Sequence, residues 1–470
     1  MSILKTYQFR PRVRRLSDAP LPAQCLSRLR ERDGLVLLHS AAGEPRRFSL
    51  LAFDPLAGDD GVALAPAESL AGLRELRGQL SADGGDAPPP FFAGGLLAAL
   101  SYDLGACDES LDLPREAHAS PLVVGGLYTD YLCFDHARGE TWLVLGDEPG
   151  DGRPVASERE DAVRAALAAS AREGPVEALG PLVRECPGEV HRARIADVRD
   201  RIAAGEIYQA NIAHAFHREL RADPVDIYLR LERVNPAPYM AHFTWRRGAE
   251  RGAILSASPE LLLESDGRIV RTRPIKGTSA RHADPVRDAA SAQALLASAK
   301  DRAELAMIVD LERNDLGRIA TPGGVRVNGF PTLSSYASVH HLSAEVVAHL
   351  REGLDAADLL AAVFPGGSIT GAPKLASMEA IAQLEGEGRG FFTGSLGLWD
   401  LTGRACFNIL IRTLCWRPMR EAGVGRVRYH VGGGITWGSN AADEEAETMI
   451  KGERLARALD AAPTRVGEPS

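Results

Sequence analysis

The sequence has few cysteines, and none of them occurs at a spacing that binds zinc. Closely paired cysteines are what a structural zinc site needs, and dense cysteines are typical of small secreted domains. We therefore expect reduced thiols, mostly packed inside a cytoplasmic protein. The six cysteines are Cys25, Cys107, Cys133, Cys186, Cys406 and Cys415.

Long apolar segments and an excess of positive charge are missing as well. The longest apolar run, Phe91–Leu100, is too short to span a bilayer, and residues 1–15 lack the apolar core of a secretory signal. The formal net charge of −9 argues against a general surface for nucleic acid or anionic membranes. A buried site for an anionic substrate remains open, provided that local cations or a metal balance its charge.

The composition is that of a globular protein with room for two or three domain-sized units, since 45% of residues are hydrophobic and 25% are charged. We divide the chain into an N-terminal portion (1–145), a linker (146–185), a catalytic portion (186–462) and a tail (463–470). Strand and helix patterns that mix without strict alternation predict an α/β (α+β) fold in which helices cover β-sheets.

Hydrophobic periodicity predicts the elements of the catalytic portion. Helices are expected at 189–204, 292–315, 356–364, 374–384 and 441–459. Strands are expected at 206–216, 253–255, 261–264, 407–414 and 427–431.

Lys276 follows a strand-like run in the sequence TRPIKGTS. Pro274 restricts the residue before it and Gly277 permits a bend, so we expect Lys276 to lie on ordered backbone. A lysine so placed is either a solvated surface charge, which is the ordinary interpretation, or a nucleophile if burial removes its proton.

Two predicted helices carry acidic faces. Asp301 and Glu304 lie one turn apart, and Glu444, Glu447 and Lys451 form a single stripe on the last helix. Each face taken alone is typical of a solvated amphipathic helix. The functional alternative is a pair of carboxylates from two helices that hold Mg²⁺, which prefers oxygen ligands.

Two glycine-rich segments and one arginine are candidates for anion binding. Residues 365–374 (PGGSITGAPK) lead into a helix whose free amides could hold a carboxylate or phosphate, and residues 432–434 predict a tight turn or an anion nest. Arg412 lies in an apolar strand, and a buried arginine needs an anionic partner.

Two further side chains have both an ordinary and a functional interpretation. His341 is a packed or surface histidine unless it faces a ligand, and Glu260 is a solvated strand end unless burial raises its pKa enough to donate a proton. No dinucleotide glycine pattern, serine-hydrolase elbow or helix-spaced zinc pair occurs.

Taken together and in this order, the motifs resemble the chorismate-utilising enzymes: the anthranilate, aminodeoxychorismate, isochorismate and salicylate synthases. The resemblance covers about residues 189–459, and a looser one covers the N-terminal portion. The fold that it implies is a two-part sandwich of stacked β-sheets flanked by helices. The motifs are GEIYQ from Gly205, SPELL from Ser258, PIKGT from Pro274, KDRAE from Lys300, DLERNDLGR from Asp310, PGGSITGAPK from Pro365, IRT from Ile411 and GGGI from Gly432.

The lysine in PIKGT distinguishes members of this family. Aminodeoxychorismate synthases carry lysine at the position of Lys276, whereas anthranilate synthases typically carry alanine. Isochorismate and salicylate synthases carry a water-activating lysine where this chain has Gln209, which argues against water as the nucleophile. The resemblance therefore implies amination of chorismate by ammonia, with an anthranilate synthase as the enzymatic alternative.

The resemblance also implies roles for the candidate residues. Lys276 would attack the ring and Glu260 would protonate the departing hydroxyl group. The metal Mg²⁺ would be held by Glu304, Glu447 and Glu444 at the ring carboxylate. The substrate would be contacted by Gly277, Thr278, His341, Arg412, Gly432, Gly433, Gly434 and Lys451.

Two partners follow from the same resemblance. No glutamine amidotransferase signature occurs in the chain, so ammonia is expected from a separate glutaminase subunit. Tryptophan, an inhibitor or structural ligand of related synthases, is a further candidate, with ordinary packing as the alternative. A homologue that binds tryptophan or a glutaminase without turnover is the non-enzymatic alternative. The tryptophan candidates are Ser40, Arg47, Phe48, Pro238, Tyr239 and Met240.

Overall fold

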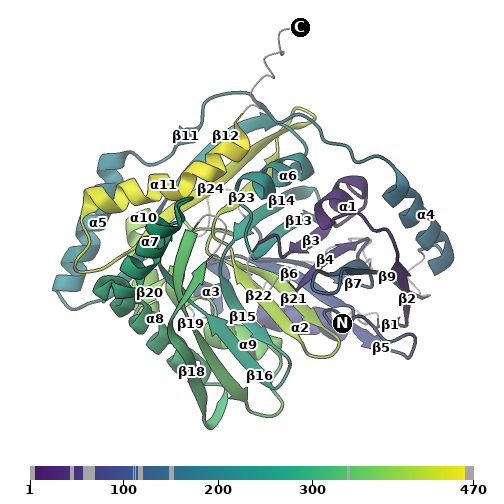
Figure 1. Ribbon diagram of the computed structural model, residues 1–470, viewed down its shortest axis with the longest axis horizontal. Coiled ribbons are helices and arrows are strands. Elements are labelled where there is room, and N and C mark those ends of the chain that lie inside the picture. Colours follow the sequence, from purple (N-terminus) through teal and green to yellow (C-terminus); the bar gives the residue numbers. More distant parts are fainter. Residues whose placement is uncertain are drawn as a thin grey trace.

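The computed structural model describes residues 6–42, 47–56, 69–108, 111, 113–114, 120–147, 153–335 and 339–460. The predicted tail, 463–470, lies outside this part of the chain. Within it, two large antiparallel sheets dominate the architecture, and helices lie along their outer faces (Figure 1). No helix among these residues is long and apolar enough to cross a membrane.

The first large sheet runs in the order β10-β12-β24-β23-β14-β13-β3-β4-β8-β9-β2, and β11 and β20 also pair with β12. Its strands are β2 (Pro11–Leu16), β3 (Val36–His39), β4 (Phe48–Phe53), β8 (Asp130–Asp135), β9 (Glu140–Gly146), β10 (Glu177–Ala178), β11 (Val183–Arg184), β12 (Gln209–Arg221), β13 (Tyr239–Arg247), β14 (Glu250–Ser258), β20 (Gly371–Ala372), β23 (Thr413–Pro418) and β24 (Val424–Ile435).

The second large sheet runs in the order β17-β19-β16-β15-β22-β21-β6-β7, and β18 also pairs with β19. Its strands are β6 (Gly95–Leu100), β7 (Val123–Tyr128), β15 (Leu261–Ser265), β16 (Ile269–Arg273), β17 (Ile275–Ala280), β18 (Ala320–Ser335), β19 (Val339–Leu350), β21 (Ser395–Asp400) and β22 (Ala405–Ile409). A small parallel pair joins β1 (Tyr7–Phe9) to β5 (Leu80–Ala82).

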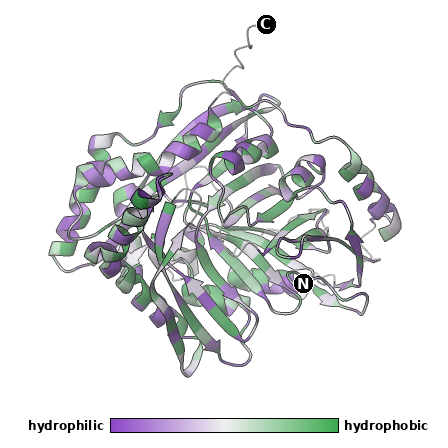
Figure 2. Cartoon of the chain, viewed as in Figure 1, coloured by the Kyte–Doolittle hydropathy of each residue, from purple (hydrophilic) through white to green (hydrophobic). Residues whose placement is uncertain are grey.

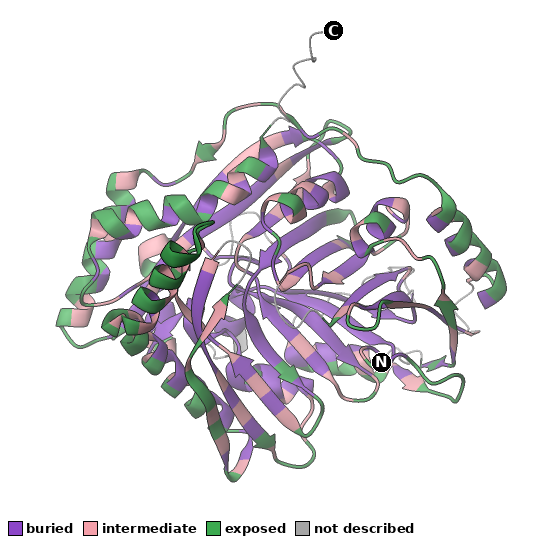
Figure 3. Cartoon of the chain, viewed as in Figure 1, coloured by how far each residue is buried: buried purple, intermediate pink, exposed green. Residues whose placement is uncertain are grey.

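The helices cover these sheets and present polar faces outward (Figures 2 and 3). They are α1 (Pro22–Arg28), α2 (Leu70–Gly78), α3 (Asp103–Asp108), α4 (Ala156–Ala168), α5 (Gly188–Ala203), α6 (Pro224–Val234), α7 (Pro285–Ala297), α8 (Ala299–Gly317), α9 (Ala356–Val363), α10 (Lys374–Glu385) and α11 (Ala441–Leu459), with a short 3-10 turn at Gly367–Ile369.

The main hydrophobic core lies between the two large sheets. Phe243 and Ile254 of the first sheet share one buried cluster with Leu97 and Phe407 of the second. Alternate side chains of each strand point into this layer, because successive residues of a strand face opposite sides of the sheet. The predicted sandwich of stacked sheets flanked by helices is therefore confirmed.

The N-terminal and catalytic portions share both sheets. Strand β3 pairs with β13 in the first sheet, and β6 pairs with β21 in the second. Segments more than 200 residues apart in the sequence thus lie side by side, and the core between the sheets is built by both portions.

Three sequence-based expectations are wrong in detail. The helix expected at 292–315 is two helices, because Ser298 ends α7 and caps α8 by accepting a hydrogen bond from Asp301 N. The strand expected at 407–414 is split between β22 and β23, which belong to different sheets. The expected turn at 432–434 lies inside β24, paired with β12.

Candidate active site

Lys276 lies on β17, at an irregularity in its pairing with β19. The register shifts between Lys276 and Thr278, and Gly277 between them has a φ of +73°. A Cβ atom at Gly277 would lie 2.9 Å from the Asp301 carboxyl group, so only glycine permits both this backbone and this approach of α8. The expected ordered setting of Lys276 is therefore present.

The amine of Lys276 lies among carboxylates and one backbone carbonyl. Its Nζ donates to Ser368 O at 3.3 Å. Although the residue as a whole is half-buried, burial of the amine is the strongest influence on its pKa and lowers it, while Glu304 and Glu260 oppose that shift. A larger fraction of Lys276 is therefore uncharged near neutral pH than of an ordinary lysine.

Glu260 is buried at the start of β15, beside Lys276. Its Oε1 accepts a hydrogen bond from Ile275 N at 3.4 Å, and its side chain is close enough to Lys276 for their charges to interact. Burial raises the pKa of Glu260, and the Ser368 hydroxyl and Lys276 limit that rise. A carboxyl group of this kind is suited to donate a proton.

The acidic faces of α8 and α11 meet near the amine of Lys276, since Glu304 and Glu447 both act on its charge. Lys300 Nζ lies 3.9 Å from Glu304 Oε1 on α8 and 3.8 Å from Glu444 Oε1 on α11. Glu444 is buried and accepts a hydrogen bond from Ser439 Oγ at 2.7 Å. The ordinary interpretation of two separate solvated faces therefore does not hold for Glu304 and Glu444.

The third acidic candidate is more exposed. Glu447 Oε1 forms an ion pair with Lys451 Nζ at 2.8 Å, and Lys451 also donates to Gly432 O at 3.2 Å. Burial is the largest single influence on the pKa of Glu447 and raises it, but Lys451, Lys300 and Lys276 together outweigh it and the pKa falls. For Glu304, burial prevails over Lys276 and Lys300, and the pKa is raised.

The donor set of these two helices suits a hard divalent cation, because it consists of carboxylate oxygens. In the described residues, however, no group of three or more acidic, histidine or cysteine side chains is arranged to hold a metal ion. Lysine ammonium groups contact the carboxylates instead. A metal at this position would have to replace Lys300 between Glu304 and Glu444.

His341 lies opposite Thr278 in the neighbouring strand β19. Its Nδ1 is 2.9 Å from Thr278 Oγ1 and 3.3 Å from Gly277 O. Burial lowers the pKa of His341 to about 4, and the nearby Arg412 acts in the same direction, so the imidazole is neutral at pH 7. Gly277, Thr278 and His341 therefore form one connected edge of the site.

Arg412 lies at the crossing between the two sheets rather than inside a strand. It falls between β22 and β23, with a left-handed φ of +52°, a conformation that bulky residues rarely adopt. Its guanidinium makes no hydrogen bond or ion pair with the described residues, and its electrostatic neighbours are Arg454 and Glu260. This half-buried cation is available to an anionic ligand.

The three glycines of β24 form a flat part of the site wall. A Cβ atom at Gly433 would lie 3.4 Å from Glu444 Oε2, and one at Gly434 would lie 2.7 Å from Gln209 Nε2 and 3.4 Å from Lys276 Nζ. Their pairing with β12 places them in a strand rather than in a turn, and binding of an anion there stays a prediction. Glycine is needed here for the close approach of side chains.

Sequence reasoning missed two contributors, Ser368 and Lys300. Ser368 belongs to the PGGSITGAPK segment, and its carbonyl receives the hydrogen bond of Lys276. Lys300 begins the KDRAE motif, and only the folded structure shows that its ammonium lies between Glu304 and Glu444. Both lie in motifs that the sequence analysis identified, but the local sequence does not show which groups these two residues contact.

The tryptophan candidates lie around the adjoining ends of β3, β4 and β13. Met240 pairs with His39, Ser40 N donates to Ser49 Oγ, and the Arg47 guanidinium lies 5.0 Å from the centre of the Phe48 ring. Tyr239 O accepts a hydrogen bond from Asn408 Nδ2, and Pro238 precedes it. This group is separate from the residues around Lys276, and tryptophan binding there stays a prediction.

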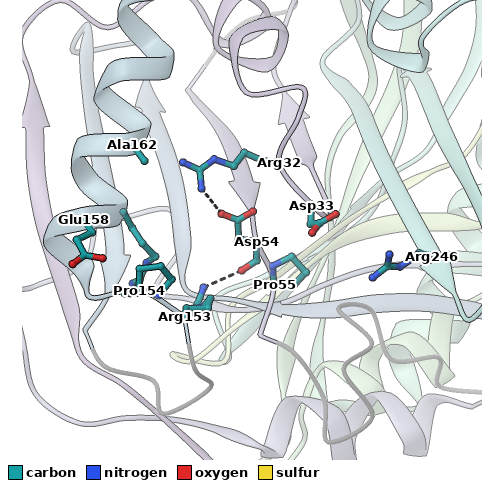
Figure 4. A pocket seen from close by; sticks show the side chains of 10 residues that line it. Arg32, Asp33, Asp54, Pro55, Arg153, Pro154, Glu158, Ala162 and Arg246 are labelled. Atoms are coloured by element: carbon teal, nitrogen blue, oxygen red, sulfur yellow. Dashed lines mark hydrogen bonds and ion pairs between the residues drawn. The ribbon is translucent and has the colours of Figure 1, made fainter.

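Two cavities lie away from the Lys276 site. One, of about 400 Å³, is lined by Arg32, Asp54 and Arg153 among others, and its Arg32–Asp54 ion pair spans 2.8 Å (Figure 4). The other, of about 410 Å³, lies between α1, α6 and the segment at 171–173. Arg32 and Arg153 of the first cavity are paired with Asp54 and Asp130, and neither cavity is lined by a residue predicted for the Lys276 site.

A family model described as chorismate binding enzyme matches residues 52–457. The chain belongs to this family and is a chorismate-utilising enzyme, which confirms the predicted family. An anthranilate synthase component 1 from Streptomyces coelicolor is 37% identical over 410 residues, covering 82% of this chain and 77% of the relative. An aminodeoxychorismate synthase component 1 from Bacillus subtilis is 33% identical over 442 residues, covering 90% and 91%. A protein of that same name from Klebsiella aerogenes is 39% identical over 376 residues, covering 78% of each chain.

Solved structures agree with the fold. The anthranilate synthase component I of Streptococcus pneumoniae has a TM-score of 0.71 at 27% identity, covering 88% of this chain and 92% of that chain. The menaquinone-specific isochorismate synthase of Escherichia coli has a TM-score of 0.74 at 18% identity, covering 98% and 96%. The second likeness shows the fold alone.

Proposed function

We propose that this chain is component I of an aminodeoxychorismate synthase, which converts chorismate and ammonia to 4-amino-4-deoxychorismate for 4-aminobenzoate and folate synthesis. One observation carries the proposal: the amine of Lys276 is enclosed beside Glu260, and burial lowers its pKa. Several relatives that bear this name, including those from Bacillus subtilis and Klebsiella aerogenes, match over most of the chain.

The proposed reaction has two substitution steps. The free amine of Lys276 bonds to C2 of the ring, both ring double bonds shift, and the C4 hydroxyl leaves as water with the proton of Glu260. Ammonia then bonds to C4, both ring double bonds shift back, and Lys276 leaves C2 as its neutral amine. Lys276 begins and ends as the neutral amine, and the one proton that ammonia loses on bonding to the ring restores Glu260, so the net change is chorismate plus ammonia to the amino product plus water.

The remaining residues would bind and orient the two carboxylates of chorismate. Arg412 is the free cation for the pyruvyl carboxylate, with the flat wall of Gly432, Gly433 and Gly434 beside the ligand. Gly277, Thr278 and neutral His341 would contact the ring end, and Lys451 would add positive charge near Glu447.

Magnesium completes the proposal. Glu304, Glu444 and Glu447 would hold Mg²⁺, which would neutralise the ring carboxylate and fix its position. Burial by the surrounding residues would keep water away from the amine of Lys276 and favour the protonated form of Glu260.

The experiment is product analysis with the purified chain, chorismate, magnesium chloride and an ammonium salt. We expect 4-amino-4-deoxychorismate without released pyruvate, and intact-protein mass analysis during turnover should show a ring adduct on Lys276. Lys276→Ala should lose product formation by at least about a hundredfold while the protein stays folded. Full activity in that variant would disprove the covalent route.

An anthranilate synthase is the second candidate, because the relative from Streptomyces coelicolor matches with comparable identity. Fluorescent anthranilate and stoichiometric pyruvate in the same assay would favour it. A protein that binds tryptophan or a glutaminase without turnover is the third. It would leave chorismate unconsumed in the presence of ammonium salts.

Partners form the last part of the proposal. The relatives named component 1 imply a second subunit, and we propose a glutaminase that supplies ammonia to the Lys276 site. The group of Ser40, Arg47, Phe48, Pro238, Tyr239 and Met240 is the proposed site for tryptophan. Isothermal titration of the wild type with tryptophan tests this site. If no heat of binding is measured, tryptophan is not a ligand of this protein.

A further inference from the structure

The side chain of Lys300 on α8 lies between α8 and α11 and contacts acidic residues of both helices. Its ammonium reaches Glu304 four residues along α8 and, at 3.8 Å, Glu444 on α11. The side chain of Lys300 is 59% exposed, whereas those of Glu304 and Glu444 are 17% and 9% exposed. One lysine that extends from solvent thus serves two mostly buried carboxylates.

The carboxylates need a positive charge at this position. Two buried acidic groups that face each other repel, and a buried charge without a partner is strongly destabilising. The neighbouring acid Glu447 has its own partner, Lys451, at 2.8 Å. Lys276 also acts on the charge of Glu304, but among the described residues Lys300 is the cation that is paired with both Glu304 and Glu444.

Its contacts are also those of a cation that can leave. Both distances, 3.8 and 3.9 Å, are longer than a hydrogen bond, so the ammonium is held by charge alone. Lysine carries a compact charge on a flexible stem, and an ion pair with an exposed lysine is weakly held.

We propose that Lys300 is an exchangeable internal cation, which neutralises Glu304 and Glu444 in the metal-free enzyme and withdraws into solvent when a divalent cation binds them. This inference rests on the magnesium site of the proposed function. It explains why the acidic side chains of α8 and α11 form no preassembled metal cluster within the described residues. Lys300 would thereby set the affinity for metal and keep α8 and α11 together without it.

The test is isothermal titration of magnesium chloride into the full-length wild type and Lys300→Met, which removes the charge and keeps the stem. We expect Lys300→Met to bind Mg²⁺ about tenfold more tightly, because the metal no longer competes with the ammonium. Without metal, its melting temperature should fall below that of the wild type, and saturating Mg²⁺ should remove the difference.

Arg302→Met is the matched control. Arg302 is an exposed cation on the same helix, it makes no ion pair with the described residues, and its loss changes the net charge equally. Its affinity for Mg²⁺ should change less than about twofold. An equal gain in both variants would mean that general charge, rather than displacement of Lys300, controls binding.

The remaining outcomes are also decisive. Unchanged or weaker binding by Lys300→Met overturns the inference, and Lys300→Gln provides the same comparison if the methionine variant fails to fold. Absence of Mg²⁺ binding in every protein overturns the metal site itself. Product analysis of the wild type decides the proposed reaction separately, so the two failures are distinguishable.

Discussion

At the scale of single residues, chemistry depends on which groups carry a proton. Lys276 must be uncharged to attack a ring, and an ordinary lysine has a pKa of about 10.4. Burial lowers the pKa of Lys276, while Glu304 and Glu260 limit the effect. Glu260 shows the opposite case, since burial raises its pKa and favours the protonated form that the proposed reaction would use.

The first prediction concerns the acid limb of the pH profile. Because only the free amine reacts, kcat/KM for chorismate should rise with pH through the lowered pKa of Lys276. The midpoint should lie below about 10.4, the value for an exposed lysine. Stopped-time assays of chorismate consumption across pH measure it. A rise that tracks an ordinary lysine would contradict the burial argument.

Glu312 supports a second prediction, about stability. It is buried on α8 and accepts a hydrogen bond from Thr272, while the nearby Lys374 is paired with Asp315 at 2.8 Å. Burial raises the pKa of Glu312 to about 8, so the folded protein binds more protons than the unfolded chain between roughly pH 4.5 and 8. This contribution therefore decreases stability as pH rises through that window.

Glu312→Gln removes the titration and keeps the shape. The difference in unfolding free energy, variant minus wild type, should become more positive by a few kcal/mol from pH 5.5 to pH 8.5. Urea unfolding at the two pH values measures the difference. Glu345→Gln, at a surface ion pair with Arg273, is the control. An identical pH dependence in wild type and Glu312→Gln would show that Glu312 ionises normally.

At the scale of elements, β24 and α11 together build one wall of the site. Glu444 is fixed by Ser439, and Thr448 one turn later is 2.9 Å from the buried His214 Nε2 on β12. The helix is thus joined to the preceding loop on one side of Glu447 and to the sheet on the other. The glycines of β24 leave room for the side chains of Lys276 and Gln209 beside the strand.

The third prediction tests this close approach. Gly434→Ala would place a methyl group 2.7 Å from Gln209 Nε2 and 3.4 Å from Lys276 Nζ. We expect kcat/KM to fall by at least about tenfold with little change in melting temperature, since a misplacement near 1 Å has large catalytic effects. Gly438→Ala, where a Cβ atom would meet nothing within 4 Å, should keep full activity. Equal activity in both variants would mean that the wall tolerates a side chain.

At the scale of the whole molecule, the two sheets join the ends of the sequence. Strand β21 of the catalytic portion pairs with β6, and β13 pairs with β3. Leu97 and Phe407 belong to one core cluster. Removal of the N-terminal portion would therefore leave two open sheet edges and an exposed apolar layer.

The fourth prediction follows from this arrangement. Residues 186–470 expressed alone should aggregate or lack cooperative thermal unfolding, because their strands lose partners in both sheets. Solubility and near-ultraviolet circular dichroism measure the result. Addition of separately expressed residues 1–185 should restore part of the signal. A soluble fragment that consumes chorismate by itself would show that the catalytic portion is independent.

The sequence by itself determined where most helices of the catalytic portion lie and predicted which side chains would react. Helical periodicity placed α5, α9, α10 and α11 within about one residue, because apolar spacing and caps are local properties. Lys276 and Glu260 were identified from motifs, and their burial supports that assignment.

Only the tertiary structure decided how these elements meet. Arg412 and the segment at 432–434 were misassigned because a change of sheet and a pairing with β12 depend on strands distant in the sequence. Lys300 could not be recognised, since its partner Glu444 comes from another helix. Local patterns specify periodicity and conformation, whereas the electrostatic setting of the site arises from contacts that form only when the whole chain folds.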